Sequence, residues 1–281
     1  MRNQFITGVL GLISLFLCHV SSAAESEAAG SGYEAGIISE TGQVQGYFAL
    51  GVDESNIPAT LIPDQTGSKY GKLLILHDSD GGMASPGLVN DLRFSLAESG
   101  WTTMTIALDY PEVLNVFRPN SYVPNAQSSS ETPIAETVSK SEATSTDSSP
   151  VPDNVSRVAA ALAYLNAQQN GPTVIVALGQ AVSLAMGLAE QQGKTKGQIW
   201  LAYDQALPEE STISPVLDIV PAAFASATVA QNRRLKSKTV DSDYSQQVIK
   251  GAGHDFQGFE NQVLSLIKGW LRNKFVPEAK P

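Results

Sequence analysis

The stretch Val174-Ile-Val-Ala-Leu-Gly-Gln-Ala-Val-Ser183 decides the fold, because a buried strand runs directly into a helix there. The apolar run Thr173 to Leu178 has no polar break, which is typical of a strand covered on both faces. The segment Val182 to Gln191 is expected to be helical. Only small or short residues separate the two, so the chain turns sharply between them. We predict a strand–turn–helix unit at this place.

Similar units precede and follow this stretch. Apolar runs predict the strands and a spacing of three to four residues predicts the helices. The expected strands are edge strands within Gln43 to Ile62, then Lys72 to His77, Trp101 to Leu108, Thr173 to Leu178, Gln198 to Ala202, Ser214 to Val220 and Tyr244 to Lys250. The expected helices contain Leu88, Leu92 and Leu96, then Val155 to Leu165, Val182 to Gln191, Ala222 to Leu235 and Gln262 to Asn273. This alternation predicts an α/β protein, in which a doubly wound, mostly parallel sheet lies between two helical layers.

Residues 1–24 are typical of a signal peptide that is cleaved on export. Arg2 gives the positive start, Phe5 to Val20 is apolar, and small residues end the segment. A membrane anchor is the alternative, but the apolar part is short for a span. A lipoprotein anchor on Cys18, the only cysteine of the chain, fits less well because Leu17 precedes it where a small residue is expected. We expect a periplasmic or secreted protein with no stable membrane insertion.

The rest of the chain divides by composition. Residues 25–42 are rich in Ala, Gly, Ser and Glu and are expected to be a flexible lead-in. Residues 43–281 are expected to form one domain, interrupted by a disordered insertion at about 112–152 whose Ser, Thr, Glu and Pro cannot bury enough surface to fold. The insertion could also be a lid.

Composition limits the classes of partner. The 42% of hydrophobic residues suffice for a packed core, and the formal net charge of -10 argues against nucleic acid as a partner. The chain has no phosphate-binding loop, dinucleotide-binding fingerprint or zinc-ligand spacing, so no cofactor or metal is expected.

The order and spacing of these elements resemble the α/β-hydrolase superfamily, most closely its poorly characterised exported bacterial members. In that superfamily a buried strand runs into G-x-S-x-G, a sharp turn that exposes a nucleophilic serine. Aligned with this motif, Gly179 and Gln180 precede Ala181, which stands in the nucleophile position, and Ser183 stands at the second glycine. A methyl group cannot attack a carbonyl, so the resemblance implies a site without its nucleophile. Ser183 is a less suitable alternative nucleophile, because it lies two residues further along the helix.

The same resemblance places the general base and the acid. His254 follows Gly251-Ala-Gly253 between the last strand and the last helix, where the superfamily carries its catalytic histidine. Asp218 is a weak candidate for the acid, since it lies inside a predicted strand and is as readily a structural carboxylate. The position at which the resemblance expects the acid is occupied by Phe224.

His77 and Asp78 follow the first buried strand, where the superfamily has a His-Gly turn whose backbone amides help to bind an oxyanion. Asp78 replaces the glycine, and together with Asp80 it makes that place unfavourable for a second negative charge. A metal site on His77, Asp78 and Asp80 is disfavoured, because neighbouring residues on a turn rarely converge on one ion. We expect His77, Asp78, Gly179 and Gln180 to line a binding cleft.

These observations favour an exported α/β-hydrolase-like protein that is not an enzyme of the serine type and binds a small molecule or an envelope protein in the former active-site cleft. A working periplasmic hydrolase with a displaced nucleophile, such as an esterase or peptidase, is the first alternative. A structural or envelope-interaction protein is the second.

Overall fold

The fold is taken from a computed structural model that describes residues 44–111, 151–168, 170–192, 195–207, 215–222, 227–239 and 243–276. The expected signal peptide and lead-in lie outside these residues, as do Phe224 and nearly all of the expected insertion at about 112–152. Within the described part, no helix has the length and apolar character needed to cross a membrane.

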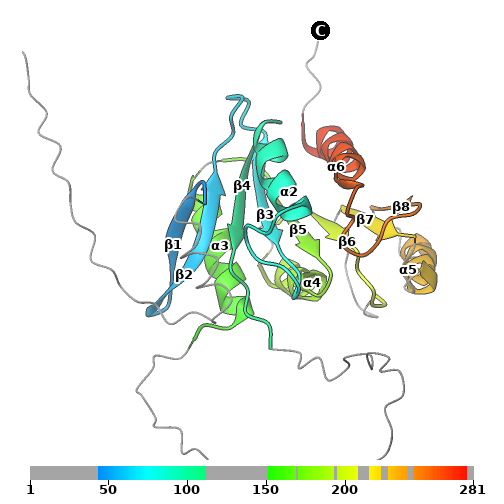
Figure 1. The fold of residues 1–281 in the computed structure, drawn as a ribbon, viewed down its shortest axis with the longest axis horizontal. Helices are drawn as coiled ribbons and strands as arrows, with labels where there is room; N and C mark the ends of the chain where they lie inside the picture. The colour runs from blue at the N-terminus through cyan, green and yellow to red at the C-terminus, as the bar shows by residue number, and fades with distance from the viewer. Residues whose placement is uncertain are drawn as a thin grey trace, which may run out of the picture.

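Strands and helices alternate along the chain, as the sequence predicts (Figure 1). The strands are β1 (Tyr47–Val52), β2 (Ser55–Ile62), β3 (Gly71–Leu76), β4 (Trp101–Ile106), β5 (Thr173–Leu178), β6 (Gly197–Leu201), β7 (Val216–Pro221) and β8 (Tyr244–Ile249). The helices are α2 (Leu88–Ala97), α3 (Asn154–Gln168), α4 (Ala181–Gln192), α5 (Ala227–Thr239) and α6 (Glu260–Phe275).

The described strands form one sheet in the order β1-β2-β4-β3-β5-β6-β7-β8. Only β2 runs against its neighbours, β1 and β4, while all other pairs are parallel. Parallel neighbours need crossover connections. Helices α2, α3, α4 and α5 lie in the connections that follow β3, β4, β5 and β7, whereas part of the connection between β6 and β7 lies outside the described residues. The predicted mostly parallel, doubly wound sheet is therefore confirmed.

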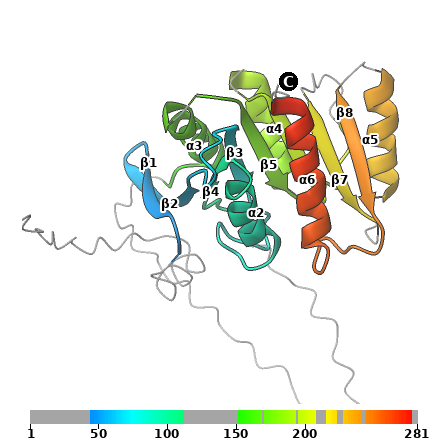
Figure 2. The same cartoon turned by 90° about the horizontal axis from the view of Figure 1, so that it is seen from above.

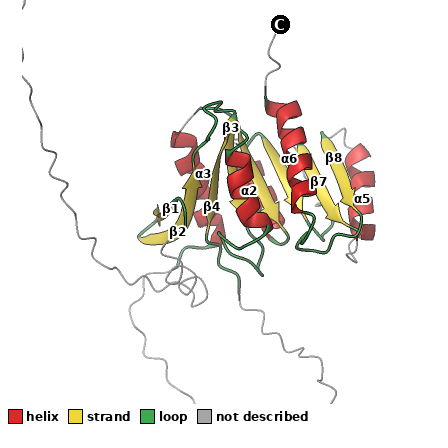
Figure 3. Cartoon of the chain, turned by 45° about the horizontal axis from the view of Figure 1, so that its top comes forward, coloured by secondary structure: helices red, strands yellow, loops and turns green. Residues whose placement is uncertain are grey.

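Helices lie on both sides of the sheet, which gives three layers (Figures 2 and 3). Helices α2 and α6 pack together on one face, whereas α3, α4 and α5 lie on the other. Successive residues of a strand point to opposite faces, so β3 contributes to both cores. Leu73 and Ile75 belong to the cluster with α2 and α6, whereas Leu74 and Leu76 belong to the cluster with α3 and α4.

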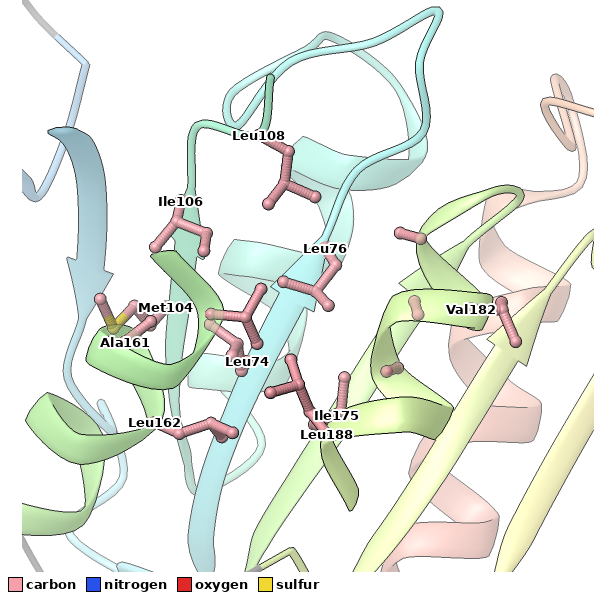
Figure 4. Close-up of a cluster of buried hydrophobic side chains, with 14 of the residues drawn as sticks. Leu74, Leu76, Met104, Ile106, Leu108, Ala161, Leu162, Ile175, Val182 and Leu188 are labelled. Carbon is pink, nitrogen blue, oxygen red and sulfur yellow. The ribbon is translucent and has the colours of Figure 1, made fainter. Parts of the chain in front are cut away.

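The second of these clusters lies under α3 and α4 (Figure 4). Each labelled side chain is buried; they are Leu74, Leu76, Met104, Ile106, Leu108, Ala161, Leu162, Ile175, Val182 and Leu188. Because both faces of β3 and β5 are covered, each of these strands contains the apolar run from which it was predicted. The buried strand β4 combines apolar residues with β-branched threonines. The six parallel strands β3 to β8 also end at the same edge of the sheet, so the loops that follow them meet there.

The two ends of the expected insertion are held together. Asn154 accepts a hydrogen bond at its side-chain oxygen from the backbone N–H of Asp109 (2.7 Å) and donates one to the carbonyl of Asp109 (2.6 Å). Arg157 on α3 donates to the carbonyl of Ala107 (2.9 Å). The described residues on the two sides of 112–150 are therefore joined directly by hydrogen bonds.

We predict that residues 112–150 can be replaced by a Gly/Ser linker of about six residues, which spans the gap with ease. Shortening the loop should stabilise the domain by about 1–2 kcal/mol at most, through the smaller cost of loop closure. Urea unfolding of the two forms measures this. A clear loss of stability would show that the segment packs on the domain. In the shortened form, Asn154→Ala should lower the free energy of unfolding, because it removes the two hydrogen bonds to the backbone of Asp109.

Candidate functional site

The loops at the carboxyl edge of the sheet bring Asp78, Gly179, Gln180 and His254 together. Asp78 follows β3, Gly179 and Gln180 connect β5 to α4, and His254 lies in the loop between β8 and α6. The carboxylate of Asp78 is the common partner, and all contacts of the site described below involve it.

One oxygen of Asp78 accepts hydrogen bonds from two backbone amides. Its Oδ1 accepts from the N–H of Ser79 (2.7 Å) and from the N–H of Gln180 (3.0 Å). The Gln180 amide stands just before the first residue of α4, where amides lack helical partners and the helix dipole favours negative charge. The site therefore holds a negative oxygen on two amides.

The other oxygen of Asp78 faces His254. The His254 Nε2 lies 3.1 Å from Asp78 Oδ2, which makes the pair an ion pair whenever the imidazole is protonated. The Asp78 residue is only 8% exposed, whereas 34% of the His254 side chain is accessible. The pair is thus reachable from solvent on the histidine side.

Gly179 gives this carboxylate its space. A Cβ atom built on Gly179 would stand 1.7 Å from Asp78 Oδ2, far inside van der Waals contact. The backbone of Gly179 also has φ +50°, a conformation that glycine adopts at no steric cost. A glycine is therefore required at position 179 for two reasons: the backbone has a positive φ, and the Asp78 carboxylate fills the space of a side chain.

This geometry corrects the predicted position of the turn. Ala181 was expected at the apex, but it is the first residue of α4 and is buried, whereas Gly179 has the positive φ. In the G-x-S-x-G pattern the apex thus falls on Gly179, with small Ala177 and Ala181 on either side. The motif can be aligned with either Ala181 or Gly179 at the serine position, and small residues flank both. Only the second alignment puts a glycine at the position with positive φ. That preference is the signal that sequence reasoning missed.

Ser183, the alternative nucleophile, lies away from this group. It is the third residue of α4 and is exposed, and its Oγ lies 3.5 Å from Oε1 of Gln205, in the loop after β6. No contact with His254 is found for it in the described part of the chain.

Asp218 is a structural carboxylate and not the partner of His254. It stands mid-strand on β7 opposite Gln246 of β8, and its side chain is fully buried. Arg233 of α5 binds both of its oxygens (Nη2 to Oδ2 3.0 Å, Nη2 to Oδ1 3.2 Å), and Tyr244 and Gln246 donate to Oδ2 as well. Burial, and then the Asp218 charge, raise the pKa of the Tyr244 hydroxyl. The register of β7 points Asp218 at α5, and these contacts fit the structural carboxylate that the sequence allowed beside the weak candidacy of Asp218 for the acid.

His77 is part of the scaffold and does not line the site. It is buried; its Nε2 accepts from the N–H of Leu108 (3.0 Å), so its Nδ1 carries the proton and donates to the carbonyl of Asp78 (2.8 Å). Both ring nitrogens are thus used by the backbone, which leaves no lone pair for a metal. Burial lowers the pKa of this imidazole. Among the described residues, no group of three or more His, Cys, Asp or Glu side chains is placed to hold a metal ion.

Comparisons with known proteins agree with this architecture. Residues 45–273 match the family described as "Protein of unknown function (DUF3530)". No curated protein matches the chain.

Solved structures resemble the chain over most of its length. An α/β serine hydrolase without a lid from Xanthomonas campestris is 12% identical, with a TM-score of 0.59 over 84% of this chain and 96% of that one. A putative α/β hydrolase of unknown function from Agrobacterium tumefaciens is 15% identical (TM-score 0.58, 83% and 99% covered). The Pyrococcus furiosus esterase Pf2001 is 10% identical (TM-score 0.57, 85% and 95% covered). At these identities the likeness shows the fold alone, and it confirms the α/β-hydrolase fold.

We predict that Asp218→Asn destabilises the domain by about 3–5 kcal/mol, because Arg233 then stays buried without a counter-charge. Urea unfolding measures the loss. Since Asp218 holds α5 and not His254, the NMR resonances of the His254 ring should stay where they are in the folded variant. A change in those resonances would show that Asp218 acts on His254 after all.

A second prediction concerns His77 and pH. Unfolded His77 gains a proton as the pH falls below about 6.5, whereas the folded residue stays neutral because burial lowers its pKa. The unfolded state then binds more protons, so the stability that is present above pH 6.5 is lost on acidification, by at most about 1.4 kcal/mol per pH unit from this residue.

Urea unfolding between pH 7.5 and 5.5 tests this prediction. His77→Gln should be less stable than the wild type at pH 7.5 but should lose less stability on acidification. Equal slopes for His77→Gln and the wild type would contradict the assignment.

Proposed function

The chain belongs to the family described as "Protein of unknown function (DUF3530)", and from the geometry of its site we propose that it is a binding protein that does not work as a serine hydrolase. The observation that carries the proposal is the position of the Asp78 carboxylate, which fills the place of both the nucleophile and the oxyanion.

The apex of the turn carries no nucleophile. Gly179 has no side chain, and the Asp78 oxygen occupies the space into which a serine would project. The serine nearest in sequence, Ser183, is exposed on α4 and its hydroxyl faces Gln205 instead of His254. A general base without a nucleophile cannot start acyl transfer, so His254 lacks the group that it would deprotonate.

The oxyanion site is occupied from within. An oxyanion hole in this fold uses the amide after the nucleophile and one from the loop after β3, and here these are the amides of Gln180 and Ser79. Both already donate to Asp78 Oδ1. A tetrahedral intermediate would have to displace this carboxylate from both amides, and the free energy that the displacement costs is lost from the stabilisation on which acyl transfer depends.

A binding role makes use of what remains. The loops at the carboxyl edge of a parallel sheet are where ligands bind in open α/β folds, and the exposed part of His254 makes the site accessible there. The ligand is a small molecule or an envelope protein, met in the periplasm or outside the cell after removal of residues 1–24. The negative charge of the chain disfavours nucleic acid.

A second candidate function is a hydrolase that uses Asp78 and His254 themselves. The distance of 3.1 Å between their side chains favours it, because a carboxylate and an imidazole in contact can move a proton. Under this alternative the wild type turns over a substrate, and either Asp78→Ala or His254→Ala removes the turnover. A structural or envelope-interaction role would need neither residue.

We predict that the wild type is not labelled by a fluorophosphonate probe, whereas the double variant Asp78→Ala/Gly179→Ser is labelled. The double change supplies a hydroxyl at the apex, frees the two amides and places the hydroxyl beside His254. The single variant Gly179→Ser should stay unlabelled and lose stability, since its Cβ overlaps Asp78. Labelling is the readout because turnover also needs an acid that orients His254.

Two controls fix the interpretation. Adding His254→Ala to the double variant should abolish labelling, and Ala181→Ser with Asp78→Ala should give none, since Ala181 is buried in α4. Labelling of the wild type, or hydrolysis of short-chain esters by it that requires His254, would refute the proposed function. Labelling of the variant with Ala181→Ser, but not of the variant with Gly179→Ser, would show that Ala181 and not Gly179 occupies the nucleophile position.

A further inference from the structure

Asp78 contacts its neighbours as a bound carboxylate ligand would. Its Oδ1 accepts from the amides of Ser79 (2.7 Å) and Gln180 (3.0 Å), and its Oδ2 lies 3.1 Å from Nε2 of His254. Two backbone amides thus donate to one oxygen of the carboxylate, and the His254 ring lies against the other. Donor sets of this kind, directed at both oxygens, recognise carboxylates.

The two amide donors belong to the scaffold and do not depend on the Asp78 side chain for their positions. Gln180 is fixed by the turn into α4, where the amide of Gly179 also donates to the carbonyl of Leu201 on β6 (2.8 Å). His77 holds the carbonyl of Asp78 through its Nδ1, and so fixes the loop backbone that carries the Ser79 amide. The carboxylate can therefore rotate away while the amides remain in place.

From these contacts we propose that the amides of Ser79 and Gln180 and the ring of His254 form a carboxylate-binding site, which Asp78 fills as an internal ligand and which a small carboxylate monoanion enters by displacing it. The inference deepens the proposed binding function, on which it rests for its biological meaning, by giving the ligand a chemical class.

Charge selects a monoanion. Asp78 remains attached to the loop after displacement, and Asp80 is exposed two residues further on. A second negative charge on the ligand would be repelled by both, whereas a single charge replaces the one that leaves the site. The Asp78 carboxylate lies directly against Gly179, and the His254 side chain is the part of the site that is open to solvent, so the rest of the ligand extends toward His254.

The test uses the folded mature protein and sodium acetate as the probe. Asp78→Ala empties the site, so its thermal midpoint should rise with acetate in a saturable way, and calorimetry should show one binding site. Acetamide, which has the same shape but no charge, should give no such rise at equal concentration. The wild type should bind acetate at least tenfold more weakly than the variant, because Asp78 competes.

Three variants serve as controls. Asp78→Asn keeps an acceptor over the amides and should not respond to acetate, and Glu98→Ala, which removes an exposed charge at the end of α2, should behave as the wild type. Asp78→Ala/His254→Ala should bind acetate at least tenfold more weakly than Asp78→Ala. If Asp78→Ala is too unstable to purify, its refolding yield in acetate against acetamide gives the same comparison.

The absence of saturable acetate binding by Asp78→Ala would overturn the inference, as would equal binding by Asp78→Asn or by the His254→Ala form. These results are independent of the fluorophosphonate experiment. Hydrolysis of esters by the wild type would remove the proposed function and leave the carboxylate site intact, whereas a silent Asp78→Ala variant would remove the site and leave the lack of a serine nucleophile untouched.

Discussion

The contact between the carboxylate of Asp78 and the bare α-carbon of Gly179 is the constraint on which the site depends. Because Gly179 has no side chain, the carboxylate reaches the amide of Gln180 (3.0 Å) at the start of α4 and lies against His254 (3.1 Å). One buried charge therefore joins the loops after β3, β5 and β8. The neutral ring of His77, held by Leu108 and the Asp78 carbonyl, keeps the first of these loops against the sheet.

The fold could be predicted from the sequence because both faces of the sheet are covered. Strands such as Thr173–Leu178 are continuous apolar runs for this reason, and helices such as α6 carry an apolar stripe. The antiparallel strands β1 and β2 in the order β1-β2-β4-β3 were harder to predict, since strand propensity near the edge of a sheet depends strongly on context. The signal peptide and the disordered insertion stay predictions, because they fall outside the described residues.

The site could be predicted only in part. His254, Asp78, Gly179 and Gln180 were all identified from their places in the chain, but the apex was placed two residues late, on Ala181, since small residues fit both registers. His77 was expected to line the cleft and Asp218 was a weak candidate for the acid. Both side chains are buried and bound within the fold, and only three-dimensional contacts show this. Nothing in the sequence indicated that the negative charge of Asp78, expected to oppose an oxyanion, is itself the anion on the amides.

The central claim is that the Asp78 carboxylate occupies the two-amide site in the resting protein. Backbone amide resonances in a proton–nitrogen NMR spectrum test it most directly, since amide protons that donate to a carboxylate resonate downfield. We predict that the Ser79 and Gln180 amide protons are downfield in the wild type and move upfield together in Asp78→Ala, while amides elsewhere in α4 stay unchanged. Unchanged positions for both amides in Asp78→Ala would contradict the account.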